Sequence, residues 1–160
     1  MTNITIREAI LDLFRRSKCK AGQMVPMRTI NMKFQRQGVE YMSIINQLEQ
    51  EGLVEIKEGS LTGLFLTEKG YDEIYTCRSD NSLIDLLMSQ FRKTNCKVGQ
   101  GFMFRTLQYT VMNNLNPKEE VRFIEMCNKM ISEDYIIVEF ENNYPQFVKL
   151  TDKGYHYIYG

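Results

Sequence analysis

The chain has 160 residues, of which 43% are hydrophobic and 25% are charged, an ordinary balance for a globular protein. Its 20 basic residues equal its 20 acidic residues, which argues against a protein coated in nucleic acid, and no apolar run is long enough to cross a membrane. The N-terminal residues lack a signal-peptide pattern, and the four cysteines form no C-x-x-C pair. We therefore expect reduced thiols, a cytoplasmic location and no membrane partner.

Two helices and a short strand are predicted in the first 35 residues. Apolar residues at helical spacing predict the first helix over about 4–16, and these residues are Ile6, Ala9, Ile10, Leu13 and Phe14. Met24-Val25 follows a glycine and predicts a short strand. The second helix is expected over about 26–35, with Pro26 in its first turn, where a missing N–H costs nothing.

A third helix, a hairpin and a short last helix are predicted next. The third helix ends at Gly52 and presents one apolar face, formed by Tyr41, Ile44, Ile45 and Leu48. Residues 53–56 and 64–66 flank a turn-rich segment and predict a hairpin. Thr67 is expected to cap the last helix.

The same order of elements is predicted again from residue 82 onward. Ser82 is the expected cap of a helix that contains Leu83, Leu86, Leu87 and Phe91. A short strand at 102–103 and a helix over about 104–113 follow. A second hairpin is expected from 135–138 and 147–150, around a loop at 141–146, with Thr151 as the final cap.

The long helix before this second hairpin has the clearest start signal. Asn116 is the expected cap, Pro117 takes the first position, and Glu119 can complete a capping box. Its predicted buried face consists of Phe123, Ile124, Cys127 and Met130.

An internal repeat explains why the elements recur. Leu66-Thr67-Glu68-Lys69-Gly70-Tyr71 returns as Leu150-Thr151-Asp152-Lys153-Gly154-Tyr155, and each phrase runs on to an Ile-Tyr pair. Phe14-Arg15 and Gly22-Gln23 return as Phe91-Arg92 and Gly99-Gln100. A fixed repeat indicates two copies of one unit. We expect domains at 1–77 and 83–160, joined by a polar linker at 78–82.

The residues of the repeated phrase have an expected structural role. Leu would end a strand, Thr would cap a helix, and Gly would permit close packing.

Each copy resembles the winged helix-turn-helix domains of MarR-like and PadR-like regulators. The carriers are Leu48-Glu49-Gln50-Glu51-Gly52-Leu53-Val54 and Leu66-Thr67-Glu68-Lys69-Gly70. The second copy keeps the second phrase but has Met130 and Asp134 in place of Leu48 and Gly52. The resemblance implies a mainly α fold with small β-hairpins (α+β), in two tandem winged-helix domains.

Catalytic patterns are absent from the sequence. The single histidine, His156, lies in a predicted helix without a partner cluster, and Gly99-Gln100-Gly101 lacks the third glycine of a phosphate loop. We therefore expect a protein that is not an enzyme and that uses neither a cofactor nor a metal.

Charge separates within each copy although the whole chain is neutral. Residues 13–39 hold seven basic residues and no acid, and residues 86–118 hold five and none. Residues 40–77 hold two basic against eight acidic residues (−6), and residues 119–160 hold four against eight (−4). In a winged helix the basic stretch would cover the second helix and the turn into the third, which lie along DNA phosphates. Ordinary solvated surfaces explain the same residues, so both interpretations stay open.

The candidate DNA contacts are basic residues and the outward positions of the third helices. They are Arg28, Lys33, Arg36, Ser43, Asn46, Gln47, Arg105, Lys118, Arg122, Asn128 and Lys129. Asn and Gln side chains pair with adenine. However, Glu40 and Glu49 would repel phosphate, and neither hairpin tip carries an arginine. Phe140 and Tyr144 on the second hairpin suit a protein surface at least as well.

Two functions are compatible with these observations. The first is a DNA-binding transcriptional regulator in which two winged helices in one chain mimic a dimer and bind a duplex. In it the second copy would supply the stronger base contacts and the basic stretches would supply phosphate contacts. Replication initiation by paired winged helices is a variant of it that sequence does not separate. The second is a protein-interaction module of a larger assembly, favoured by the neutral net charge and the aromatic second hairpin. A homodimer is compatible with both.

Overall fold

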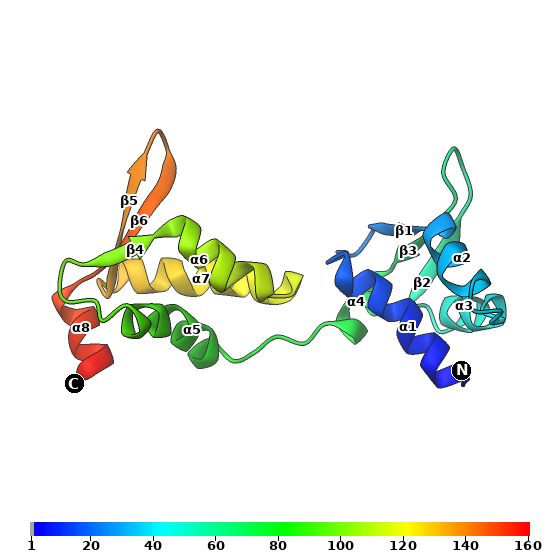
Figure 1. Cartoon of the computed structure of the whole chain (residues 1–160), viewed down its shortest axis with the longest axis horizontal. Helices are drawn as coiled ribbons and strands as arrows, with labels where there is room; N and C mark the ends of the chain where they lie inside the picture. The colour runs from blue at the N-terminus through cyan, green and yellow to red at the C-terminus, as the bar shows by residue number, and fades with distance from the viewer. Residues whose placement is uncertain (1) are drawn as a thin grey trace. The chain divides into compact units, whose positions relative to one another are not determined.

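The computed structural model of the chain describes residues 2–160, which form two compact units (Figure 1). The first unit ends at Thr76, and the second runs from Cys77 to Gly160. Over the described residues the fold is α+β, with eight α-helices and two antiparallel sheets of three strands each. The expected combination of helices with small hairpins is confirmed.

Unit 1 places one sheet beside four helices in residues 2–76. In chain order its elements are α1 (Asn3–Arg16), β1 (Met24–Pro26), α2 (Met27–Gln35), α3 (Met42–Gln50), β2 (Val54–Lys57), β3 (Gly63–Leu66) and α4 (Glu68–Ile74). The strand order is β1-β3-β2, and the loop of the β2–β3 hairpin projects beyond the helices (Figure 1). Pro26 ends β1 and precedes α2, whereas it was expected inside the first turn of that helix.

The core of unit 1 collects the apolar faces of its first three helices and the sheet. Its fully buried side chains include Ile10, Phe14, Ile30, Phe34, Ile44, Ile45, Leu48, Leu64 and Leu66. Each such side chain contributes roughly 1.5–3 kcal/mol when it leaves water. Tyr41 fixes the start of α3 against α2, because its hydroxyl bonds Asn31 and its ring stacks on Phe34 with centroids 5.3 Å apart.

Unit 2 repeats the order, with an added 3-10 helix and a longer α7 and hairpin. They are α5 (Asp80–Lys93), β4 (Gly101–Met103), α6 (Phe104–Thr110), the 3-10 helix η1 (Met112–Asn114), α7 (Pro117–Ser132), β5 (Ile136–Glu141), β6 (Tyr144–Leu150) and α8 (Asp152–Tyr159). The strand order is β4-β6-β5. The predicted capping box of α7 is confirmed, since Asn116 accepts the Glu119 N–H and Glu119 accepts the Asn116 N–H.

The expected linker at 78–82 is too long at its C-terminal end. Asp80–Ser82 form the first turn of α5, and the cap is Ser79, whose Oγ accepts the Ser82 N–H at 3.2 Å. Apolar periodicity begins only at Leu83, so this polar first turn carries no periodic signal. Arg78, just before the cap, is anchored to the buried Glu119 carboxylate at 3.1 Å.

Two further boundaries differ from the expectation. The helix expected over 104–113 ends at Thr110, whose hydroxyl bonds the Thr106 carbonyl at 2.7 Å, and η1 follows. Such back-bonding and the β-branched Thr110-Val111 pair weaken a helix. The second hairpin has no six-residue loop: its strands reach Glu141 and Tyr144. Asn142 and Asn143 have positive φ angles of 50° and 65°, as a tight hairpin turn requires.

The doubled phrase has the expected structural role in both units. Thr67 Oγ1 accepts the Gly70 N–H at 2.9 Å and donates to the Gly52 carbonyl at 2.6 Å. Thr151 repeats this with Gly154 at 3.0 Å and with Asp134 at 2.6 Å. The phrase therefore fixes α4 against the C-terminal end of α3, and α8 against the C-terminal end of α7.

Candidate functional site

The predicted basic residues of unit 1 lie on α2 and the turn after it. Arg28 and Arg36 are exposed, and neither has an ion-pair partner within residues 2–160. Lys33 is half-buried, with Nζ 5.9 Å from the Phe34 ring centroid. Arg15 differs, because Asp12 at 2.8 Å and Glu8 at 3.1 Å bind its guanidinium. Arg28 and Arg36 therefore place unpaired positive charge on α2 and the turn after it.

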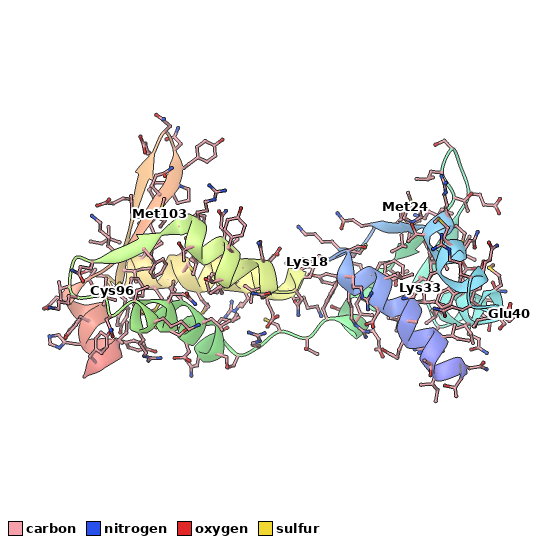
Figure 2. The ribbon with its side chains drawn as sticks, in the orientation of Figure 1. Lys18, Met24, Lys33, Glu40, Cys96 and Met103 are labelled. Carbon is pink, nitrogen blue, oxygen red and sulfur yellow. The ribbon has the colours of Figure 1, made fainter. Side chains whose placement is uncertain are left out.

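The outward face of α3 is polar and uncharged. Ser43, Asn46 and Gln47 are all exposed there. The Glu40 carboxylate accepts the Met42 N–H and the Ser43 hydroxyl, each at 3.0 Å. Glu40 therefore satisfies a backbone N–H at the start of α3. Figure 2 labels both Glu40 and Lys33 of α2 on unit 1.

Glu49, the second acid that would repel phosphate, faces the sheet of unit 1. Glu49 accepts the Ile56 N–H of β2 at 2.7 Å. Both acids that would repel phosphate are thus bound to backbone N–H groups. A partial positive charge on such groups offsets part of each carboxylate charge.

The basic residues of α7 share one side of that helix but are not equally available. Lys118, Arg122 and Lys129 are spaced by four and seven residues. The Arg122 guanidinium contacts both Asp80 oxygens, at 2.7 and 2.6 Å, and Glu125 at 2.6 Å. The hydrogen bond from Arg122 lowers the pKa of Asp80, and the same contacts raise the pKa of Arg122. The charge of Arg122 is therefore balanced by two carboxylates of unit 2.

Arg105 is the exposed cation of α6, and it is held by a neighbouring ring. Its guanidinium carbon lies 5.5 Å from the Tyr109 ring centroid, and Nη2 lies 3.4 Å from the Tyr109 hydroxyl. That hydrogen bond raises the pKa of Arg105 and lowers the pKa of Tyr109. Arg105 keeps its charge and has no carboxylate partner in the described chain.

The opposite side of α7 borders an apolar groove. The groove has a volume of about 250 Å³ and lies between α6, α7 and the β5–β6 hairpin. Its lining residues include Phe104, Leu107, Ile124, Cys127, Asn128, Ile131, Val138, Phe140 and Pro145. The candidate Asn128 therefore lies at the groove, apart from Lys118, Arg122 and Lys129.

The prediction that Ile124 is buried is wrong. Ile124 is 49% exposed, and Met126 joins Phe123 and Met130 on the buried face. Apolar residues of α7 form two faces at helical spacing, and sequence did not show which one faces the core. Burial raises the pKa of Cys127, at the edge between the faces, to about 12.

The apolar groove was missed, although comparison of the two copies carried a signal for it. With Glu51 aligned to Glu133, Ile131 corresponds to Glu49 and Phe140 to Glu58. A position that is acidic in one copy and exposed and apolar in the other is not explained by the shared fold. Such positions mark surfaces with different roles.

Comparison with known proteins adds no assignment to this geometry. No family model matches the sequence, and no curated protein matches it. None of the helices in residues 2–160 has the length and apolar character needed to cross a membrane. In the same residues, no cluster of three or more His, Cys, Asp or Glu side chains could hold a metal ion.

Proposed function

We propose that the chain is a DNA-binding protein, a transcriptional regulator with one winged-helix domain in each unit. The order of elements supports this: helix, short strand, two helices, hairpin and final helix occur in unit 1 and again in unit 2. In this proposal α3 is the recognition helix that enters the DNA groove, and the β2–β3 hairpin is its wing. The MarR-like and PadR-like resemblance of each copy is part of the same proposal.

The observation that carries the proposal is the charge distribution on unit 1. Arg28 and Arg36 are exposed and unpaired, and they precede an α3 face that presents Asn46 and Gln47 without charge. Phosphate contacts position a protein on DNA, and amide side chains in the major groove read adenine. Unit 1 is therefore assigned the main DNA contact. Lys129 and Arg105 would add phosphate contacts, while Arg122 is occupied by carboxylates.

Fluorescence anisotropy with a labelled random-sequence duplex tests this proposal. The full chain is expected to bind with a Kd in the micromolar range or below and to lose affinity steeply with added salt. Arg28→Glu combined with Arg36→Glu should weaken binding by roughly tenfold or more and reduce the salt slope by about 2, because two phosphate contacts are lost.

The matched control reverses charge elsewhere on the protein. Arg92→Glu makes the same charge change per residue on α5, where Arg92 is exposed and pairs with Asp85 at 2.8 Å. It should change binding much less than either Arg28→Glu or Arg36→Glu. Equal losses in all variants, or binding that is insensitive to salt, would contradict a DNA surface on unit 1.

A second candidate is a protein-interaction module, and the groove beside α7 favours it. Most of the exposed large apolar residues belong to unit 2, and several of them adjoin this groove. If the chain fails to bind duplex at low salt, this candidate takes precedence.

A further inference from the structure

The two units differ at the surface beside α7 and the second hairpin. On unit 2, Val121, Ile124 and Ile131 lie exposed along α7, and Ile124 and Ile131 line the groove together with Phe140 of β5. We call these four residues the α7–hairpin patch. Helical spacing of three and seven residues places the three aliphatic residues on one side of α7.

The corresponding residues of unit 1 are not apolar throughout. Val39 and Met42 stand where unit 2 has Val121 and Ile124, but Glu49 and Glu58 stand where it has Ile131 and Phe140. Glu49 is bound by the Ile56 N–H, and the surface around it includes Glu55 and Lys57. A fold of this kind therefore does not need apolar side chains at the positions of Ile131 and Phe140. Water-exposed apolar patches of this kind mark contact sites.

The area of the patch fits a protein contact. Phe140 is 65% exposed and the three aliphatic residues are 39–55% exposed, which leaves on the order of 350–400 Å² of apolar surface, given the ~200 Å² that an aromatic residue can bury. A standard interface covers ~800 Å² on each partner and is about 57% apolar, or about 450 Å². The patch alone therefore supplies most of the apolar area that one side of such an interface needs.

We propose that the α7–hairpin patch binds a second copy of this chain and forms a two-fold symmetric dimer. A two-fold contact requires a surface that complements itself. This surface has both parts, because Phe140 forms one wall of the apolar groove and is still 65% exposed. The groove volume of about 250 Å³ exceeds the ~150 Å³ of an apolar cavity that holds a benzene ring. Phe140 of each copy would pack into the groove of the other.

The charges around the patch permit two identical surfaces to meet. Arg122, which is paired with Asp80 and Glu125, lies on the opposite side of α7, and Lys149, paired with Glu139 at 2.6 Å, lies on the Ile137 face of the sheet. These pairs are closed within the unit, so they add little like-charge repulsion between copies. The patch needs no DNA, and the inference therefore stands independently of the proposed function.

Sedimentation equilibrium of the full chain tests the dimer. The mass should rise with concentration from 18.9 kDa toward twice that value, with most of the chain dimeric at about 100 µM. Ile131→Glu should weaken the dimer at least roughly thirtyfold, because it places a charge at the centre of the contact. Phe140→Glu should do the same by removing the ring from the groove.

These variants are chosen so that the fold is kept. Both introduce the residue type that unit 1 has at the same position, and the carboxylate introduced by Ile131→Glu can accept the Val138 N–H as Glu49 accepts that of Ile56. The control is Ile137→Glu, on the same strand as Phe140 and also exposed, but on the other face of the sheet. Circular dichroism checks that all three remain folded.

The expected pattern is a dimeric wild type and Ile137→Glu, with monomeric Ile131→Glu and Phe140→Glu. A wild type that stays at 18.9 kDa at about 100 µM overturns the proposal and assigns the patch to a different protein. A dimer that survives both patch variants overturns it as well, because the contact then lies elsewhere.

Discussion

At the scale of single residues, the glycines of the doubled phrase are fixed by a backbone contact. A Cβ on Gly70 would lie 2.0 Å from the Leu53 carbonyl oxygen, and one on Gly154 would lie 2.1 Å from that of Tyr135. Neither carbonyl can move away easily, because each also accepts a hydrogen bond from the hydroxyl of the threonine in the same phrase, at 2.9 Å. The glycine is therefore a packing requirement, and the repeat carries no information about a ligand.

Gly70→Ala should consequently destabilise unit 1. We expect a loss of about 2–3 kcal/mol, the usual cost of forcing atoms into a filled site. Gly59→Ala is the control, because nothing lies within 4 Å of its added Cβ, and a surface change of this kind stays within about 0.5 kcal/mol. Urea denaturation followed by circular dichroism measures both. Equal stability of the two variants would show that α4 moves away at no cost.

The pKa of the Asp80 carboxyl depends on its contact with Arg122. Hydrogen bonding to Arg122 lowers the pKa of Asp80 in the folded chain. A lowered pKa means that the contact stabilises the fold above the unfolded pKa, near ~3.9, and that this stabilisation is lost as pH falls through the folded pKa.

Arg122→Gln should therefore raise the pKa of Asp80 toward its ordinary value. NMR titration of the carboxyl measures this shift. Arg92→Gln is the control, because Arg92 contacts Asp85 instead of Asp80. An Asp80 pKa that is unchanged by Arg122→Gln would mean that the bidentate contact does not persist in solution.

At the scale of elements, α7 has two apolar faces with different environments. One packs Phe123, Met126 and Met130 into the core, and the other leaves Ile124 and Ile131 exposed. Cys127 lies between them, and burial raises the pKa of its thiol to about 12. A thiol with that pKa is almost entirely protonated at pH 8, so it is a poor nucleophile.

Alkylation at pH 8 should therefore distinguish the cysteines of the native chain. Cys77 is exposed and should react first, whereas Cys127 and the buried Cys19 and Cys96 should react much more slowly. Mass spectrometry of the digested protein locates the modified residues. All four should react at similar rates in urea, which serves as the control. Modification of Cys127 as fast as Cys77 would contradict a buried α7 thiol.

Local signals allowed most elements to be predicted. The Asn116 cap, Gly52 at φ 76° and the threonine caps depend only on neighbouring residues, and each is where sequence placed it. The missed features depend on residues far apart in the chain. Asp80 and Arg122 are separated by 42 positions, and no local rule pairs them. The choice between two apolar faces of α7 is likewise decided by what packs against it.

At the scale of the whole molecule, a net charge of zero conceals two unlike surfaces. Unit 1 keeps unpaired basic residues around α2, whereas unit 2 pairs Arg122 internally and exposes the α7–hairpin patch. The two units therefore divide the proposed work, with DNA contact assigned to unit 1 and self-association assigned to unit 2. A dimer would then carry two DNA-binding surfaces.

If both proposals hold, self-association should raise the affinity for long DNA alone. A duplex of ~40 base pairs can engage both copies of unit 1, and linked binding of this kind gains ~10²–10⁴ in affinity, whereas ~12 base pairs, little more than one turn, engage only one. Ile131→Glu should therefore weaken binding to the long duplex at least tenfold and leave the short duplex unchanged. Arg28→Glu with Arg36→Glu should weaken both. An Ile131→Glu monomer that binds long DNA as tightly as the wild type would show that the dimer contributes nothing to DNA binding.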